Sequence, residues 1–137
     1  MSHDLAFFAH APGISEADVR ASYQGYCEGL RADSGAESPV LAQFVRALEL
    51  RYPSLAALED AELDGSPWSS EFDRGPTHLI VCIAFSRAAE VGQFIWELLQ
   101  KFPLVVYDPQ ADEAFFGTDR LPLNSPTKRK AWWRFLG

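Results

Sequence analysis

One stretch constrains this chain more than any other, because residues 78–108 indicate a strand, a helix and a second strand in direct succession. The run from His78 to Phe85 is apolar after its first residue, which is typical of a strand buried on both faces. Ser86 is a suitable helix cap, and apolar residues then recur every three or four positions until Pro103. Residues 104–107 are again β-prone. The pattern predicts a β-α-β unit at the centre of the fold.

The rest of the chain supplies elements that pair with this unit or cover it. Residues 5–11 predict a first strand, and helices are expected after the caps Ser15 and Ser38. Residues 68–72 predict a strand that forms a hairpin with the central one, and residues 113–116 predict a short edge strand. The order β-α-α-β-β-α-β predicts an α/β (α+β) fold of the ferredoxin-like split kind. We expect a two-layer sandwich with a mostly antiparallel sheet in strand order 4-1-3-2 and helices on one face.

The first helix is expected to bury one apolar stripe, formed by Val19, Tyr23, Cys27 and Leu30. Cys27 and Cys82 both fall on apolar faces, and a disulfide framework would normally use more than two cysteines. We therefore predict two buried thiols.

A two-layer sandwich leaves one sheet face open, yet the central strand is apolar on both faces. Something must cover the second face. The alternatives are the C-terminal tail, a second copy of the chain, or a partner. We favour the tail, because it carries large aromatic side chains that usually become buried.

At 137 residues the chain is long enough for one domain. We assign residues 1–119 to a single α/β domain and residues 120–137 to a basic aromatic tail that docks on it. The tail holds five of the 12 Lys and Arg residues and none of the 19 Asp and Glu residues, which leaves the domain with a balance of −12. So acidic a domain argues against nucleic-acid binding and suits a basic partner.

The N-terminal residues lack the basic start of a signal peptide, and no apolar run is long enough to span a membrane. We expect a cytoplasmic protein with no membrane association, as a monomer or homodimer.

Sequence motifs for chemistry are missing. The chain has no GxxxxGK[ST], GxGxxG or GxSxG motif, and His3, His10 and His78 show no metal-ligand spacing. We therefore predict no cofactor, no metal and no catalytic residue. The most distinctive polar feature is the acidic connection formed by Glu59, Asp60, Glu62 and Asp64.

Two short motifs carry a family resemblance over roughly residues 50–112. The first is DGSPWS at residues 64–69, and the second is YDPQ at residues 107–110. In this layout the chain resembles small bacterial immunity-type proteins that accompany polymorphic or contact-delivered toxins. The resemblance implies a cytosolic inhibitor that binds a cognate toxin domain and blocks its active site. It directs attention to Trp68, Tyr107, Asp108 and Gln110, each of which can also be explained by packing or turn formation.

The leading hypothesis is therefore an immunity-type protein that binds a basic toxin. Its expected partner surface is the acidic connection with Asp112 and Glu113 as neighbours, together with the motif residues Trp68, Tyr107, Asp108 and Gln110. One alternative is a small enzyme or ligand-binding domain with a pocket at the strand ends near Trp68, Tyr107 and Asp108. A second alternative is a homo-oligomeric structural or regulatory domain.

Overall fold

The structure, a computed structural model, describes residues 2–10 and 13–120. Its strands are β1 (Ser2–Phe8), β2 (Asp73–Arg74), β3 (His78–Ala84), β4 (Val105–Asp108), β5 (Glu113–Phe116) and β6 (Asp119–Arg120). Its α-helices are α1 (Glu16–Cys27), α2 (Pro39–Arg51) and α3 (Ala88–Lys101), and three short 3-10 helices are η1 (Leu55–Ala57), η2 (Asp60–Gly65) and η3 (Phe85–Arg87). The expected docking of the tail lies outside the described residues, apart from Arg120 in β6.

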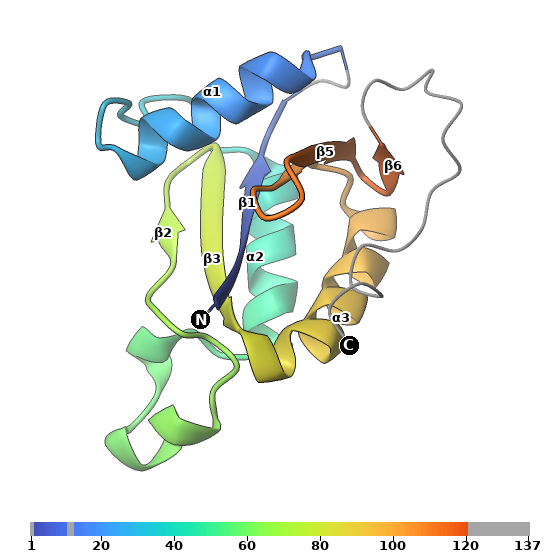
Figure 1. Ribbon diagram of the computed structural model, residues 1–137. Coiled ribbons are helices and arrows are strands. Elements are labelled where there is room, and N and C mark those ends of the chain that lie inside the picture. Colours follow the sequence, from blue (N-terminus) through green and yellow to red (C-terminus); the bar gives the residue numbers. More distant parts are fainter. Residues whose placement is uncertain (1, 11–12, 121–137) are drawn as a thin grey trace.

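The strands form one sheet in the order β2-β3-β1-β4-β5-β6, and every neighbouring pair is antiparallel. The four principal strands thus take the predicted order, and the α+β fold class is confirmed (Figure 1). The centre consists of β1 and β3, which pair along their whole length from Ser2 opposite Ala84 to Phe8 opposite His78. Both strands are apolar on both faces, and the sheet therefore needs cover on both sides.

The larger core lies between the sheet and the helices α2 and α3. Leu5 and Phe7 of β1 face Phe44 of α2, with the Phe7 and Phe44 ring centroids 4.8 Å apart. The α3 residues Val91 and Ile95 complete this layer and are fully buried. The apolar residues that recur along α3 are thus buried on one face of the helix, as predicted. Burial of each such side chain contributes roughly 1.5–3 kcal/mol to the free energy of unfolding.

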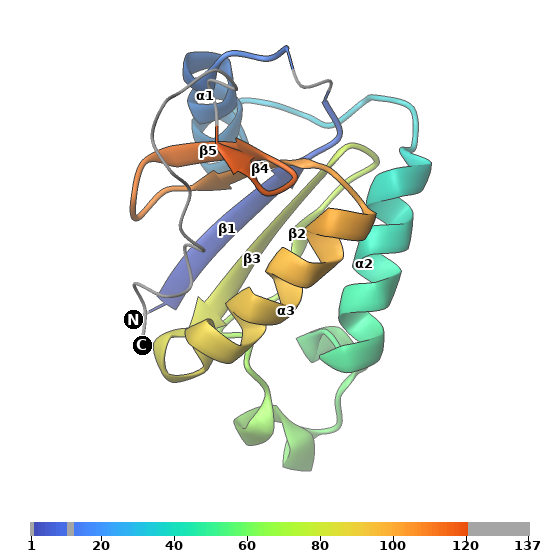
Figure 2. The same ribbon diagram turned by 90° about the vertical axis from the view of Figure 1, so that its right-hand side faces the viewer.

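The second face of the sheet is covered in part by α1, whereas the sequence led us to expect helices on one face only (Figure 2). Val19 of α1 is fully buried against Phe8, Ile80 and Val105, and Tyr23 packs at the margin. The physical reason is that Phe8 and Ile80 are large apolar side chains that point away from α2 and α3. They would be exposed to water if α1 did not cover them. Of the two helices between β1 and β2, α2 joins the main helical layer and α1 crosses to the opposite face.

The predicted buried stripe of α1 is wrong at its C-terminal end. The helix ends at Cys27, which is exposed, and Leu30 beyond it is 80% exposed. Gly29 has a φ of 71°, and the N–H groups of Gly29 and Leu30 donate to the carbonyls of Tyr26 and Gly25. A glycine in the left-handed conformation, followed by such hydrogen bonds, is a common way to end a helix. The helical spacing of apolar residues therefore no longer predicts burial beyond Cys27. Cys82, the other expected buried thiol, is half-buried.

Several element boundaries also differ from the predictions. The first strand occupies residues 2–8 instead of 5–11, because its pairing with β3 ends where Phe8 meets His78. The segment 68–72 contributes only a single bridge, from Trp68 to Ile83, and regular pairing begins at Asp73. Residues 113–116 do form β5, but β6 pairs on its outer side, so β5 is not an edge.

The start of α3 differs as well. The turn η3 precedes the helix, and Arg87 instead of Ser86 occupies the cap position, without a capping side-chain hydrogen bond.

Candidate functional site

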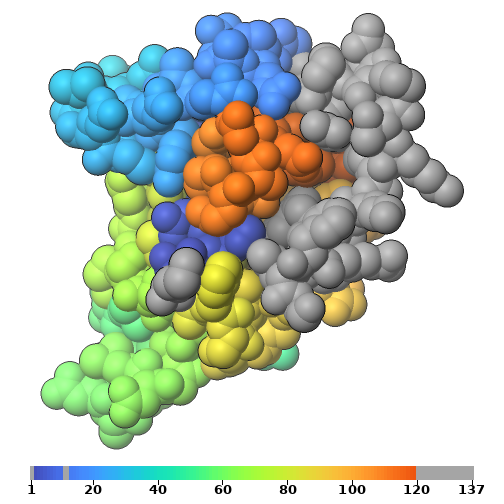
Figure 3. Space-filling model, in the orientation of Figure 1, coloured from blue at the N-terminus to red at the C-terminus, as the bar shows by residue number. Residues whose placement is uncertain are grey.

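The four predicted acidic residues lie together on one projection, the acidic lobe, which we define as residues 59–65. The lobe contains η2 and stands at the foot of the molecule, away from the sheet (Figures 1 and 3). Glu62 accepts a hydrogen bond from the backbone N–H of Glu59 at 3.0 Å, which caps the start of η2, and Gly65 ends the turn. Every residue of the lobe is exposed.

The carboxylates of the lobe have no basic partners within residues 2–10 and 13–120. Glu59, Asp60, Glu62 and Asp64 form no ion pair with any side chain that the structure describes. Carboxylates elsewhere differ: Glu90, for example, is bound by Arg87, and that bond lowers the pKa of Glu90 although burial opposes it. Four negative charges within six residues, without ion pairs in the described structure, create a local field that attracts a basic surface.

Apolar side chains accompany this charge. Leu63 within the lobe is 39% exposed, and Phe85 of η3 is 46% exposed. A hydrogen bond of 2.9 Å from the Arg87 guanidinium to the Gly65 carbonyl ties η3 to the lobe. Protein interfaces combine apolar anchors with a polar rim in this manner. The lobe and η3 together therefore offer both parts of a binding surface.

The lobe is clamped at its base by two aromatic residues. Tyr52 precedes the segment that contains the lobe, and Trp68 follows it; the rings meet edge to face with centroids 6.3 Å apart. Trp68 Nε1 donates to the Tyr52 carbonyl at 3.0 Å, and Trp68 is only 3% exposed. The Ala84 N–H also donates to the Pro67 carbonyl. Trp68 therefore positions the lobe and leaves almost no surface for a partner.

Tyr107 and Asp108 are also buried, at 4% and 3% exposure, and they build the turn between β4 and β5. The Tyr107 hydroxyl donates to Asp112 at 2.6 Å. Asp108 accepts from the backbone N–H groups of Gln110 and Ala111, and its other neighbour is the buried His3, with Nε2 at 3.4 Å. These contacts stabilise a turn, so we leave both residues out of the proposed surface.

Gln110, Asp112 and Glu113 lie on the same turn and strand, apart from the lobe. Gln110 accepts from the Asp4 backbone N–H at 3.0 Å, and Asp112 binds the Arg20 guanidinium through two bonds of 2.7 and 3.1 Å. Hydrogen bonds from Arg20 and Tyr107 lower the pKa of Asp112. Glu113 is half-buried opposite Asp108 on β4.

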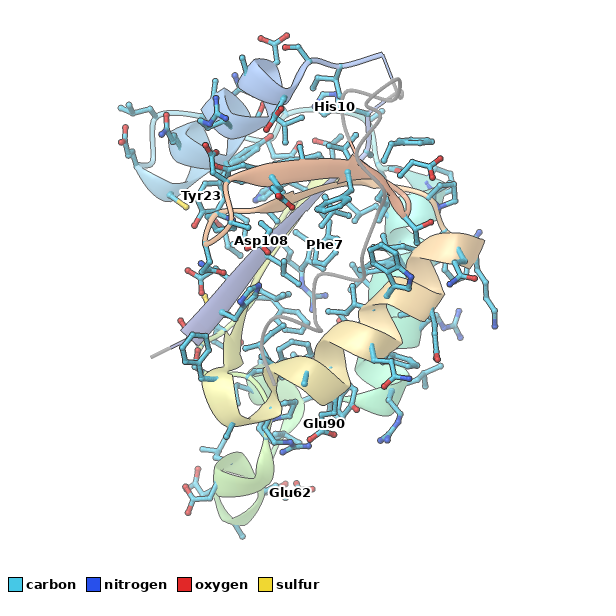
Figure 4. All side chains as sticks on the ribbon, turned by 45° about the vertical axis from the view of Figure 1, so that its right-hand side comes forward. Phe7, His10, Tyr23, Glu62, Glu90 and Asp108 are labelled. Carbon is cyan, nitrogen blue, oxygen red and sulfur yellow. The ribbon has the colours of Figure 1, made fainter. Side chains whose placement is uncertain are left out.

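The expected proximity of Asp112 and Glu113 to the lobe is not found. Asp108, which begins their turn, lies in the upper half of Figure 4, whereas Glu62 lies at its foot.

A cluster of one buried histidine and two carboxylates escaped the sequence reasoning. His78 is 5% exposed, with Nδ1 at 2.7 Å from Asp33 and Nε2 at 3.0 Å from Asp73. A neutral imidazole has one N–H group, so only a protonated ring donates to both carboxylates. Tyr26 stacks on this ring, with centroids 4.0 Å apart. In the sequence Asp33 lies in a polar loop and His78 at the start of a predicted strand. The two residues are 45 positions apart, so no local sequence pattern indicates that they are in contact.

The geometry around Asp33 identifies the cluster as a structural tie. Burial would raise the pKa of Asp33, but hydrogen bonds from His78, Thr77 and Gly35 outweigh burial and lower the pKa to about 2. Thr77 donates through both its backbone N–H and its hydroxyl, each at 2.7 Å. The cluster fastens the loop between α1 and α2 to the β2–β3 turn. Among the described residues, no group of three or more His, Cys, Asp and Glu side chains is arranged to hold a metal ion.

The structure shows a groove at another place than the pocket expected near Trp68, Tyr107 and Asp108. That groove lies between α2 and the β2–β3 turn, and none of the three residues lines it.

Comparisons with family models, with curated proteins and with solved structures found no match to this chain. Within the described part of the chain, no helix has the length and apolarity that crossing a bilayer requires. The functional conclusion therefore depends on the surface of the molecule itself.

Proposed function

We propose that this protein is a stoichiometric binding protein of the immunity type, which inhibits a basic toxin domain through its acidic lobe. The observation that carries the proposal is the lobe: four carboxylates without basic partners in the described structure, beside the exposed Leu63 and Phe85. A toxin domain that acts on nucleic acid or nucleotides needs positive charge where it binds its substrate. An acidic projection that covers this positive charge would exclude the substrate.

The construction of the lobe supports a binding role. Binding is stronger when a surface is ordered before the partner arrives, because less conformational entropy is lost. The Tyr52–Trp68 clamp and the bond from Arg87 to Gly65 hold the projection in place. The charges speed association, while Leu63 and Phe85 supply the apolar area that slows dissociation.

The test compares two charge-reversed triple variants as affinity baits in a lysate of the source cells. In the lobe variant Asp60, Glu62 and Asp64 become Lys, and in the control variant the exposed Asp18, Glu28 and Glu97 become Lys. Both variants change the net charge equally, and circular dichroism verifies that both are folded. We expect one stoichiometric basic protein on the wild-type and control baits and none on the lobe variant.

The captured protein is then expressed alone and together with each bait, and growth of the host is measured. Under the proposal the captured protein stops growth, and the wild-type chain and the control restore it while the lobe variant does not. Capture by all three baits alike would remove the lobe from the interface. A captured protein with no effect on growth would refute the inhibitor function.

A further inference from the structure

A groove of about 620 Å³ runs along α2, on the side that faces the turn between β2 and β3. Figure 2 shows α2 at the outer margin of the helical layer, where one flank is free of α3. The apolar part of the lining comes from Leu41, Ala42, Val45, Leu50 and Pro76. Leu50 is 81% exposed at the rim. A mostly apolar groove of this volume is typical of a site for a small ligand or a short peptide segment.

The two walls of the groove are fixed before anything binds. At one end Arg74 of β2 forms an ion pair with Glu49 of α2. At the other end the Ser38 N–H donates to the Pro76 carbonyl at 3.1 Å. The Asp33–His78 cluster adds a third tie, because it joins the loop before α2 to the residue that follows the turn. Such a preformed groove loses little entropy on binding.

Two charges of opposite sign line the groove and have no partner among the described residues. Glu37 stands just before the N-cap of α2, and Arg46 lies on its third turn. Seven of the nine steps between them, from Pro39 to Arg46, lie on α2, and a rise of 1.5 Å per residue corresponds to roughly 10 Å along its axis. Glu37 lies two residues before Pro39, ahead of the extended N-cap Ser38. Ala42 and Val45 of the apolar lining lie between these two charges along α2, and Leu50 lies beyond Arg46.

This arrangement selects the conformation and the charge pattern of an occupant. In an extended chain, residues i, i+2 and i+4 point to one side, and i to i+4 spans roughly 13 Å. Roughly 10 Å of helix and the two residues before it separate Glu37 from Arg46, which is comparable to the distance between two charged side chains four positions apart in an extended segment. The residue between them on the same side would lie on the apolar lining.

We propose that the groove along α2 binds an extended segment of a partner protein that carries a basic residue at i, an apolar residue at i+2 and an acidic residue at i+4. The basic residue lies beside Glu37, the apolar one against Ala42 and Val45, and the acidic one beside Arg46. This site is separate from the acidic lobe, so it stands or falls independently of the inhibitor proposal.

The test uses three acetylated and amidated peptides that differ only in charge: Gly-Lys-Ser-Leu-Ser-Glu-Gly, its form with Lys at both charged positions, and its form with Glu at both. Binding is titrated by amide chemical-shift changes in ¹⁵N-labelled full-length protein at low salt. For the wild type we expect saturable shifts at Ala42, Val45 and Leu50. The Lys/Glu peptide should bind about fivefold more tightly than either like-charged form.

Charge reversal on the protein supplies the decisive comparison. In Arg46→Glu both of these charges are negative, so the Lys/Lys peptide should become the tightest of the three. In Glu37→Lys both of these charges are positive, and the Glu/Glu peptide should bind most tightly instead. The triple lobe variant should bind all three peptides as the wild type does. The proposal is overturned if none of the peptides gives saturable shifts in the groove at millimolar concentration, or if the rank order is the same in all variants.

Discussion

The buried carboxylate of Asp33 offers the sharpest test of how this fold is held together. The substitution Asp33→Asn keeps the shape of the side chain but removes its charge. It weakens the contact with His78 and places an amide NH₂ where the carboxylate accepts from Thr77 or faces the ring. The side chains of Asp33 and His78 are each 5% exposed, so solvent provides little compensation.

The expected loss follows from the pKa of Asp33. A fall from 3.8 to about 2 means that the folded state prefers the charged form by about 2 kcal/mol. Because the folded pKa lies below the unfolded one, this stabilisation is fully present above about pH 4 and is lost as the pH falls through about 2. The asparagine variant lacks it at every pH. We therefore expect the variant to be less stable by about 2 kcal/mol at pH 6 and by about 1 kcal/mol at pH 3.

Urea unfolding followed by tryptophan fluorescence at pH 6, 4 and 3 measures both quantities, since Trp68 lies in the core. The control is Asp60→Asn on the lobe, an equal loss of charge at an exposed carboxylate without a basic partner in the described structure. Its unfolding free energy should change by less than about 0.5 kcal/mol at each pH. A variant at position 33 with wild-type stability at pH 6 would refute the reasoning. A deficit that does not shrink between pH 6 and pH 3 would show that the charge of Asp33 is not its source.

Three further substitutions test other parts of the structure. Trp68→Phe removes the hydrogen bond to the Tyr52 carbonyl and should lower the unfolding free energy by about 1–2 kcal/mol, measured by urea titration with circular dichroism; an unchanged value would mean that the bond contributes nothing. Gly29→Ala places a β-carbon on a residue with a φ of 71° and should cost about 1 kcal/mol, whereas a gain in melting temperature would contradict the helix-ending role of this glycine. Leu50→Ser should leave stability within about 0.5 kcal/mol because the side chain is 81% exposed, yet it should weaken binding of the Lys/Glu peptide severalfold; equal peptide affinity would remove Leu50 from the groove.

The two proposed surfaces differ in how they depend on the core. The acidic lobe follows α2 in the chain and is attached to the sheet through Trp68 and Pro67, so it is a projection with a buried base. The groove is part of the domain wall, and its shape depends on the ties at Ser38, Arg74 and His78. Loss of the Asp33–His78 contact should therefore disturb the groove and leave the lobe intact.

The sequence by itself determined the elements whose signal is local and strongly periodic. The apolar run of β3 and the three- and four-residue spacing in α3 specify a buried strand and a one-faced helix wherever they occur. The strand order also followed from the element order, because short connections and right-handed crossovers leave few alternatives. The acidic residues of the lobe were identifiable because they are adjacent in the chain and lie between regular elements.

Only the tertiary structure decided which face each helix covers, which motif residues are buried and which charges meet. The pattern of α1 shows an apolar stripe but cannot say which side of the sheet receives it, because β1 and β3 are apolar on both sides. Asp33 and His78 pair across 45 positions, and the charges of Glu37 and Arg46 acquire a common groove only when the β2–β3 turn stands beside α2. Such contacts depend on distances in space that no local spacing records, so packing alone fixed them.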